Sequence, residues 1–483
     1  MGLSRKVLVS MGSKIKQMVR GLFEIEPQER MKLFFLSLLY FLVVGAYTIT
    51  RDLKSSIFLG TVGKEYIPWV KVISMVMLVP AIFFYSQLVD RIRRYQLLIF
   101  YSVLFGVANL IFAYYIGHPK IGILNTDAHP SRLFGWFFYF FVEGYSPFIV
   151  GVFWALANSV NSPTEAKRNY GYMVAGSKCG GMASAALAWY IFKLSSQLAH
   201  PYLTHVAAHQ IILVVSTLFL ALVPIVVLLF IKTVPGHLLH GYEAAYQQEK
   251  HQRKSTGSTR PSIFAGLEMF VKYPYVLGIF GMVFFYETVS TVLGYLRLGA
   301  AEAGAESISD VSKVLFEIAF KAHFVGFIIS LVGTQALLSR LGTRICLMLV
   351  PFSMGGILFY LIFETSPHAL RNAFVVFTAL NYAFLAPVRE SLYLPTIKEI
   401  KFKSKSWIDA FGSKFAKTAG SMFNVFASKM GTSLMLPVYS FFFAGVVCMW
   451  FVVAFFLGRR FEQAVVNNEV IGSEEENVGK SAV

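Results

Sequence analysis

Stretches of mostly apolar residues long enough to cross a bilayer recur along the whole chain. A spanning helix needs about 20 such residues. Twelve segments meet this length: 32–57, 66–89, 95–117, 133–160, 169–193, 209–231, 274–297, 312–338, 345–363, 372–393, 408–432 and 439–457. Only 14% of the 483 residues are charged and 56% are hydrophobic, whereas a soluble domain has about 25% charged residues. The sequence therefore predicts an all-α integral membrane protein, and it excludes a cytosolic enzyme, a secreted domain and a disordered chain.

One polar interruption, residues 232–272, divides these segments into two sets of six. It is rich in charged, amide and hydroxyl side chains, which is typical of a linker. It separates an amino-terminal half at 32–231 from a carboxy-terminal half at 273–458, with a basic segment at 1–31 and a tail at 459–483. Six spans, a linker and six more spans predict the two-half architecture of a major-facilitator-type carrier.

Lysine and arginine side chains concentrate in the loops on one side of the predicted spans. Twenty-six lie on the side that holds both ends of the chain, and the other side has Lys64, Lys120, Arg132 and Arg371. Because short cytoplasmic loops carry the excess of basic residues, both ends are expected in the cytoplasm. This asymmetry accounts for most of the net charge of +17, so the charge does not indicate nucleic-acid binding. Residues 5–23 are expected to form a basic amphipathic helix on the inner leaflet, with a short transit peptide as the alternative.

Signatures of enzymes and of cofactor sites are missing from the sequence. The three cysteines form no CxxC, and Walker A, GxGxxG and HExxH motifs do not occur. His200, His205 and His209 have a spacing that zinc could use, but an exposed polar loop is the preferred interpretation. We therefore expect no cofactor, no metal and no enzymatic activity.

Charged residues inside the predicted spans are the strongest functional signal. The deepest lysines are Lys54, Lys178, Lys414 and Lys417. Facing lipid, these lysines would together cost on the order of 10 kcal/mol, so they are expected to face a watery cavity or to meet acidic partners. The candidate acidic partners inside the spans are Asp52, Glu143, Glu287 and Glu390.

Two predicted helices place a pair of cations on one face. Lys414 and Lys417 are three positions apart, as are Arg51 and Lys54, and residues with this spacing are neighbours on a helix surface. Several cations around a low-dielectric cavity form an anion site, and they favour a polyanion over a monoanion. A solvated basic stripe with no ligand role is the alternative interpretation.

Three motifs stand out in the predicted spans. They are Arg51-Asp52-x-Lys54; Glu143 followed by Phe153-Trp154-x-x-Ala157-Asn158 and Glu165-Ala166-Lys167-Arg168-x-Tyr170; and Asp409-x-x-Gly412-Ser413-Lys414-x-x-Lys417-Thr418-x-Gly420. Together they resemble the signature motifs of the ATP/ADP translocases, the nucleotide transporters of intracellular bacteria and plastids. The resemblance extends over nearly all of the predicted spans.

The resemblance implies which charges are essential for transport. They would fall on Lys54, Glu143, Glu287 and Lys417. The remaining candidate substrate-binding residues are Arg51, Lys178, Lys414 and Asn158. The chain departs from the family in having Ser55 where an acid follows the first lysine, and Phe284-Phe285-Tyr286 before the second glutamate. These departures bear on nucleotide selectivity and on coupling.

The resemblance also implies a mechanism, in which two halves rock around a midplane cavity and exchange ATP for ADP and phosphate. The lysines would hold the phosphates, and the two glutamates would pair with lysines in the empty carrier or bind ribose and base. Proton-coupled uptake of a nucleotide or another organic phosphate is the alternative. The expected partners are ATP and ADP, with phosphate or a proton, and the lipid membrane. The carrier is expected to be a monomer in a bacterial inner membrane, or alternatively in the plastid inner envelope.

Overall fold

A computed structural model describes residues 27–161, 163–197, 204–235, 272–332, 334–364, 366–381, 385–397, 400, 404–430, 432–467 and 469–472. The surface helix expected at residues 5–23 and most of the linker expected at 232–272 lie outside these residues. The described chain is helical apart from its connections and one isolated bridge between Thr396 and Ile471.

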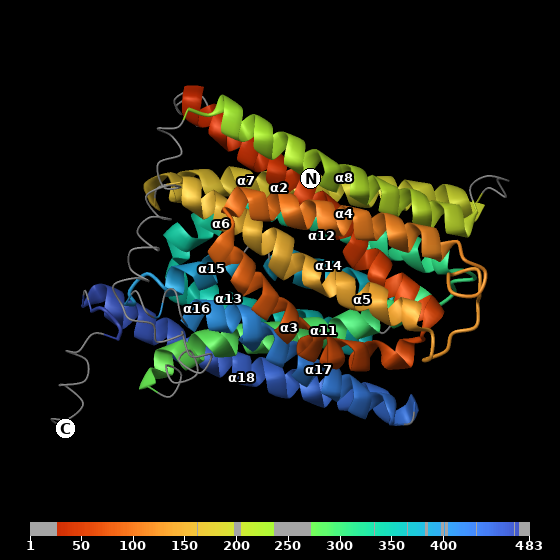
Figure 1. Ribbon diagram of the computed structural model, residues 1–483. Helices are drawn as coiled ribbons and strands as arrows, with labels where there is room; N and C mark the ends of the chain where they lie inside the picture. The colour runs from red at the N-terminus through yellow and green to blue at the C-terminus, as the bar shows by residue number, and fades with distance from the viewer. Residues whose placement is uncertain are drawn as a thin grey trace, which may run out of the picture. The chain divides into compact units, whose positions relative to one another are not determined.

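Helices dominate because, in a bilayer, a helix satisfies its backbone N–H and C=O groups within one segment. The α-helices of the described residues are α2 (Pro27–Thr61), α3 (Ile67–Arg91), α4 (Arg94–Ile116), α5 (Leu133–Tyr145), α6 (Gly151–Val160), α7 (Pro163–Gln197), α8 (His205–Thr233), α11 (Pro274–Glu302), α12 (Ile308–Val332), α13 (Thr334–Phe363), α14 (Pro367–Leu380), α15 (Ala386–Leu392), α16 (Lys405–Trp407), α17 (Ser413–Ser428) and α18 (Thr432–Val466) (Figure 1).

Seven helical segments of the described residues are long and apolar enough to cross a membrane. One of them is Leu133–Val160, in which α5 continues through a π-helical turn at Ser146–Val150 into α6. Helix α7 is not in this set, because its many small and polar side chains lower its hydropathy. Helix α12 is not in it either, because Asp310, Lys313, Glu317 and Lys321 put too many charges within one span. The prediction of an all-α chain with many spans is confirmed, and the count of twelve spans stays a prediction.

The chain forms two compact units. The first contains residues 1–258 and 301–331, and the second contains residues 259–300 and 332–483. The first unit therefore includes α12, which the sequence assigns to the carboxy-terminal half. The structural reason is a set of buried contacts between α12 and the helices α2, α7 and α8, described below.

Helix α2 packs against α5, α7 and α8 in the first unit (Figure 1). Small residues permit a close approach, since a Cβ at Gly180 of α7 would lie 2.2 Å from the carbonyl oxygen of Phe41 in α2. Near the start of α2, the buried Lys32 ammonium donates to the Val160 carbonyl at 3.1 Å. These contacts fix the position of α2, which carries two of the predicted site residues.

The second unit is built around a core in which the side chain of Trp450 is fully buried. Helix α17 lies against α11 at short range, because a Cβ at Gly420 would be 2.8 Å from the Thr288 carbonyl oxygen. Helix α13 breaks at Gly342, whose φ of +74° lies in the left-handed region that glycine tolerates. The close α11–α17 contact positions the second group of predicted site residues.

Candidate functional site

The first lysine–carboxylate pair joins α2 to α5 in the first unit. Lys54 Nζ is 2.5 Å from Glu143 Oε1, and it lies 4.3 Å from the centre of the Tyr139 ring. The lysine and glutamate side chains are 10% and 17% exposed. Opposite charges attract strongly at this depth, and the aromatic face adds a cation–π contact. The structure therefore brings together two residues that sequence analysis assigned to the site.

Arg51 pairs with its neighbour in the chain. Its Nη2 is 2.8 Å from Asp52 Oδ2, and the aspartate side chain is fully buried. Sequence analysis offered Asp52 as a partner for one of the deep lysines, but here the carboxylate balances the guanidinium one turn away from Lys54. Arg51 also lies 5.9 Å from the centre of the Tyr47 ring.

Lys178 is buried in α7 with 6% exposure. It lies within electrostatic range of His323 in α12, as Arg51 does. The His323 ring also contacts α2, since its Nε2 is 3.3 Å from Thr48 Oγ1. Sequence analysis missed His323, because a single histidine in an apolar span carries no signal until the helices around it are known.

The second lysine–carboxylate pair joins α17 to α11 in the second unit. Lys417 Nζ is 3.7 Å from Glu287 Oε2, and the two side chains are 38% and 20% exposed. Ser413 donates from Oγ to the other oxygen of the same carboxylate at 3.0 Å. Lys414 lies between these two residues in α17 and is half-buried. Two motif residues of α17, Ser413 and Lys417, thus contact the carboxylate that α11 supplies.

Both carboxylate–lysine groups lie beside a π-helical turn. The first turn, Ser146–Val150, begins three positions after Glu143. The second, Ile408–Gly412, ends at the residue before Ser413. A π turn adds a residue to the helical repeat, and such turns are frequent at functional sites. Each of the two turns changes the direction in which the next side chains point.

Asn158 of α6 is exposed and accepts a hydrogen bond from the Tyr170 hydroxyl in α7. These two residues belong to the same sequence motif, and the bond joins its two halves. The side chains of the motif between them, residues 162–169, lie outside the described residues.

The histidines near the start of α8 differ from their expected environment. His209 is fully buried rather than exposed in a loop, because α8 begins at His205 and carries it into the interior. His200 lies outside the described residues. Among the side chains that the structure describes, no three His, Cys, Asp or Glu residues are grouped to hold a metal ion.

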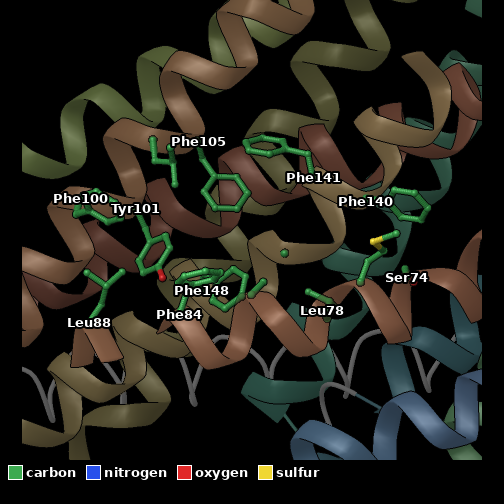
Figure 2. A pocket seen from close by; sticks show the side chains of 14 residues that line it. Ser74, Leu78, Phe84, Leu88, Phe100, Tyr101, Phe105, Phe140, Phe141 and Phe148 are labelled. Carbon is green, nitrogen blue, oxygen red and sulfur yellow. The ribbon is translucent and has the colours of Figure 1, made fainter. Parts of the chain in front are cut away.

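Figure 2 shows a pocket of about 380 Å³ in the first unit, between α3, α4 and the segment from α5 to the following π turn. Aromatic rings surround it, and those labelled in the view are Phe84, Phe100, Tyr101, Phe105, Phe140, Phe141 and Phe148. Its lining residues in the described chain are apolar or hydroxyl-bearing, so the pocket offers no cation to a phosphate. It is separate from the charged groups described above.

Relatives of known identity match nearly the full length of the chain. A family model described as TLC ATP/ADP transporter matches residues 10–380. The chain is 22% identical to "ADP,ATP carrier protein 1" of Chlamydia pneumoniae, over 94% of this chain and 96% of that protein. It is also 22% identical to "ADP,ATP carrier protein 3" of Rickettsia typhi, over 84% of this chain and 88% of that protein.

Solved structures of transporters share the fold. A D-xylose-proton symporter superposes with a TM-score of 0.60 at 13% identity, covering 88% of this chain and 96% of that chain. The nucleoside transporter NupG gives a TM-score of 0.51 at 13% identity, covering 89% of this chain and 98% of that chain. At these identities the likeness concerns the fold alone.

Proposed function

Because the chain belongs to the TLC ATP/ADP transporter family, we propose that it exchanges ATP for ADP across a membrane. The observation that carries the proposal is a lysine–carboxylate pair inside each unit, Lys54 with Glu143 and Lys417 with Glu287. Lys54, Glu143 and Lys417 belong to the motifs that resemble those of the family, whereas the residues before Glu287 depart from the family pattern. Charged groups placed this deep in apolar helices are retained for a function that needs them. A transporter of polyanions needs cationic side chains that can release a carboxylate partner and bind a phosphate instead.

In both pairs the lysine can exchange its carboxylate partner for a phosphate group. In the empty carrier each carboxylate holds its ammonium, so the lysine is not left as an uncompensated buried charge. When a nucleotide enters, phosphate oxygens take the place of the carboxylate oxygens as acceptors. The glutamates are then able to accept from ribose hydroxyls or from the base. Arg51, Lys178 and Lys414 add positive charge close to the pairs.

The balance of charges favours exchange over one-way uptake. Counting Arg51, Lys54 and Lys178 against Asp52 and Glu143, positive charges exceed negative ones by one in the first unit. Closing an empty site would bury this excess, which is costly, whereas a bound anion neutralises it. Return of the carrier would therefore require a second nucleotide.

Proton-coupled uptake of a nucleotide or another organic phosphate is the second candidate. The observation that favours it is that each essential lysine already has a carboxylate partner within 4 Å. A carrier in which these pairs suffice for neutrality could reorient empty, with a glutamate taking up the proton. In the first candidate function, the exchange of ATP for ADP, phosphate is transported together with ADP.

The setting of the carrier follows from the same proposal. It is a monomer in the lipid membrane, with twelve spans in two halves at 32–231 and 273–458 and with both ends in the cytoplasm. A bacterial inner membrane is the proposed location, since the relatives are from Chlamydia and Rickettsia, and the plastid inner envelope is the alternative. Asn158, together with the charged residues, completes the proposed substrate-binding set.

Uptake into proteoliposomes tests the proposal. The purified chain is reconstituted into vesicles loaded with ADP or with buffer, and labelled ATP is added outside. Exchange predicts rapid uptake into the ADP-loaded vesicles and little into the others. Uptake that depends on an imposed proton gradient and not on internal ADP would favour the second candidate. Absence of uptake under both conditions would contradict both.

A matched variant separates the site from general effects of charge. Lys321→Ala removes a lysine of α12 whose ammonium pairs with Glu317 in the same helix, both side chains being at least 41% exposed. This variant should exchange ATP like the wild type. A nucleotide competition panel in the same vesicles then gives the base selectivity.

A further inference from the structure

Two buried imidazoles contribute to the attachment of helix α12 to other helices of the first unit. His209 of α8 reaches a side chain of α12, and His323 of α12 reaches a side chain of α2. Both rings have less than 9% of their surface exposed. The two attachments look alike in size and burial, but their chemical surroundings differ.

The His209 ring lies among hydroxyl, backbone and aromatic groups. Nδ1 is 2.7 Å from the His205 carbonyl oxygen and therefore carries the proton. Nε2 is 3.1 Å from Ser312 Oγ, which in turn lies 2.8 Å from Ser56 Oγ in α2. The Phe192 ring packs edge-on at 4.7 Å. Both ring nitrogens of His209 therefore have partners within the protein, and we assign the ring a structural role.

The His323 ring donates to a hydroxyl that is already engaged. Thr48 Oγ1 gives its own proton to the Val44 carbonyl at 2.9 Å, so the 3.3 Å contact with His323 is a bond in which Nε2–H is the donor. This assignment follows from the hydrogen-bond network. The bond is long and joins two neutral groups, so it contributes little by comparison with a bond to an anion.

Helix geometry places His323 on the same side as two cations of the proposed site. Thr48 lies one turn from Arg51 in α2, and Gly181 lies one turn from Lys178 in α7. The ring fills the space over Gly181 so closely that a Cβ there would lie 2.5 Å from His323 Cε1. The ring therefore faces the surfaces from which the guanidinium and the ammonium project, and both cations act on it electrostatically.

We propose that His323 is a phosphate-contacting residue of the nucleotide site, supplied by α12 to the cations Lys178 and Arg51. The inference rests on the proposed function. When a phosphate binds these cations, the Nε2–H bond passes from Thr48 Oγ1 to a phosphate oxygen. A neutral hydrogen bond is thereby exchanged for a charge-assisted one, which is roughly twice as strong.

An imidazole suits this position better than a third cation would. It offers an N–H donor and adds no permanent charge beside the buried Lys178 ammonium and the half-buried Arg51 guanidinium, where a further cation would be repelled. It also links binding to motion, because the bond that phosphate replaces is one of those that attach α12 to α2. Nucleotide binding then loosens this contact of α12 and leaves the contacts of Ser312 with His209 and Ser56 intact.

Binding measurements on the full chain in nanodiscs test the inference. His323→Leu keeps the volume of the side chain and removes the donor, so ATP should bind about tenfold more weakly or worse, the effect of losing one hydrogen bond to a charged group. Inorganic tripolyphosphate should lose affinity by the same factor, since the contact is to phosphate. His323→Gln places an amide N–H near the position of Nε2 and should restore most of the affinity, whereas His323→Asn, with a shorter reach, should not.

His209→Leu is the matched control, because it removes a buried imidazole from the other attachment of α12. Its affinity for ATP should equal that of the wild type or exceed it. Wild-type affinity in His323→Leu would overturn the inference and leave the ring with attachment alone, while the proposed function would stand. Weaker binding of ATP with unchanged binding of tripolyphosphate would also overturn it, because the ring would then contact base or ribose. Failure of the wild type to bind ATP would overturn the proposed function as well.

Discussion

The two lysine–carboxylate pairs have the same chemistry and different surroundings. Lys54 and Glu143 are 2.5 Å apart, with 10% and 17% of their side chains exposed, whereas Lys417 and Glu287 are 3.7 Å apart, with 38% and 20% exposed. The first ammonium is covered by the Tyr139 ring. The second pair shares its carboxylate with a serine hydroxyl.

Because of this difference in exposure, the contribution of a pair to stability can be distinguished from its contribution to transport. Removing one member of a buried pair leaves the other as an uncompensated charge, which is strongly destabilising. Removing one member of a partly exposed pair changes stability little, because water takes the place of the lost partner. Both pairs are proposed to meet phosphate, so transport should suffer in both cases. The stability of the protein should respond to the first pair alone.

The largest effect is expected for Glu143→Ala. The substitution leaves the Lys54 ammonium buried beside an aromatic ring, and it should destabilise the protein by about 3–5 kcal/mol. Thermal unfolding in detergent, followed by intrinsic fluorescence, measures the loss. The double variant Lys54→Met/Glu143→Leu removes both charges and should recover most of the stability without recovering exchange. A single variant as stable as the wild type would refute the claim that this pair holds α2 to α5.

A smaller stability effect with an equally large loss of transport is expected for Lys417→Ala. An exposed pair is worth about 0–1 kcal/mol, so the melting temperature should stay close to that of the wild type. Exchange of ATP for ADP in proteoliposomes should nevertheless fall to background, because the proposed phosphate ligand of α17 is gone. Expression and melting of the variant are checked in the same preparation. Wild-type exchange kinetics would remove Lys417 from the mechanism.

The smallest effect is expected for Ser413→Ala. The variant removes one hydrogen bond to Glu287, a change of about 1 kcal/mol at most for a bond accessible to water. Without the serine hydroxyl, the Glu287 carboxylate would bind Lys417 more tightly. Phosphate would then have to compete with a stronger ion pair for the Lys417 ammonium. The concentration of ATP at half-maximal exchange should rise severalfold, with the maximal rate little changed. A fall in that concentration would show that the serine strengthens the pair instead.

Sequence analysis anticipated the parts of the site that depend on one helix at a time. The spacing of Lys414 and Lys417 and the motif around Glu143 follow from the chain itself. The cost of burying charge then predicted that carboxylates would be found near the lysines, and the structure pairs Lys54 with Glu143 and Lys417 with Glu287. The helical class of the fold followed in the same way from the length of the apolar stretches.

The features that sequence analysis missed depend on packing between helices. His209 was assigned to a loop, but α8 begins at His205, with Thr204 as its N-cap, and carries His209 into the interior. His323 became a candidate only when α12 was found against α2 and α7. The contacts of His209 with Ser312 and of His323 with Thr48 join residues 103 and 275 positions apart, and no local pattern records them.

The wide turn at Ile408–Gly412 has a consequence for anyone who compares this chain with its relatives by drawing it as a regular helical wheel. Each residue of an ordinary α-helix advances by about 100° around the axis, and a π turn slows that advance over its length. A wheel that treats Asp409 and Lys417 as parts of one uniform cylinder therefore assigns the aspartate to the wrong face. If a relative has one residue more or fewer at this turn, every side chain after it points in a different direction. Two relatives with the same motif sequence can then present different side chains to the same substrate.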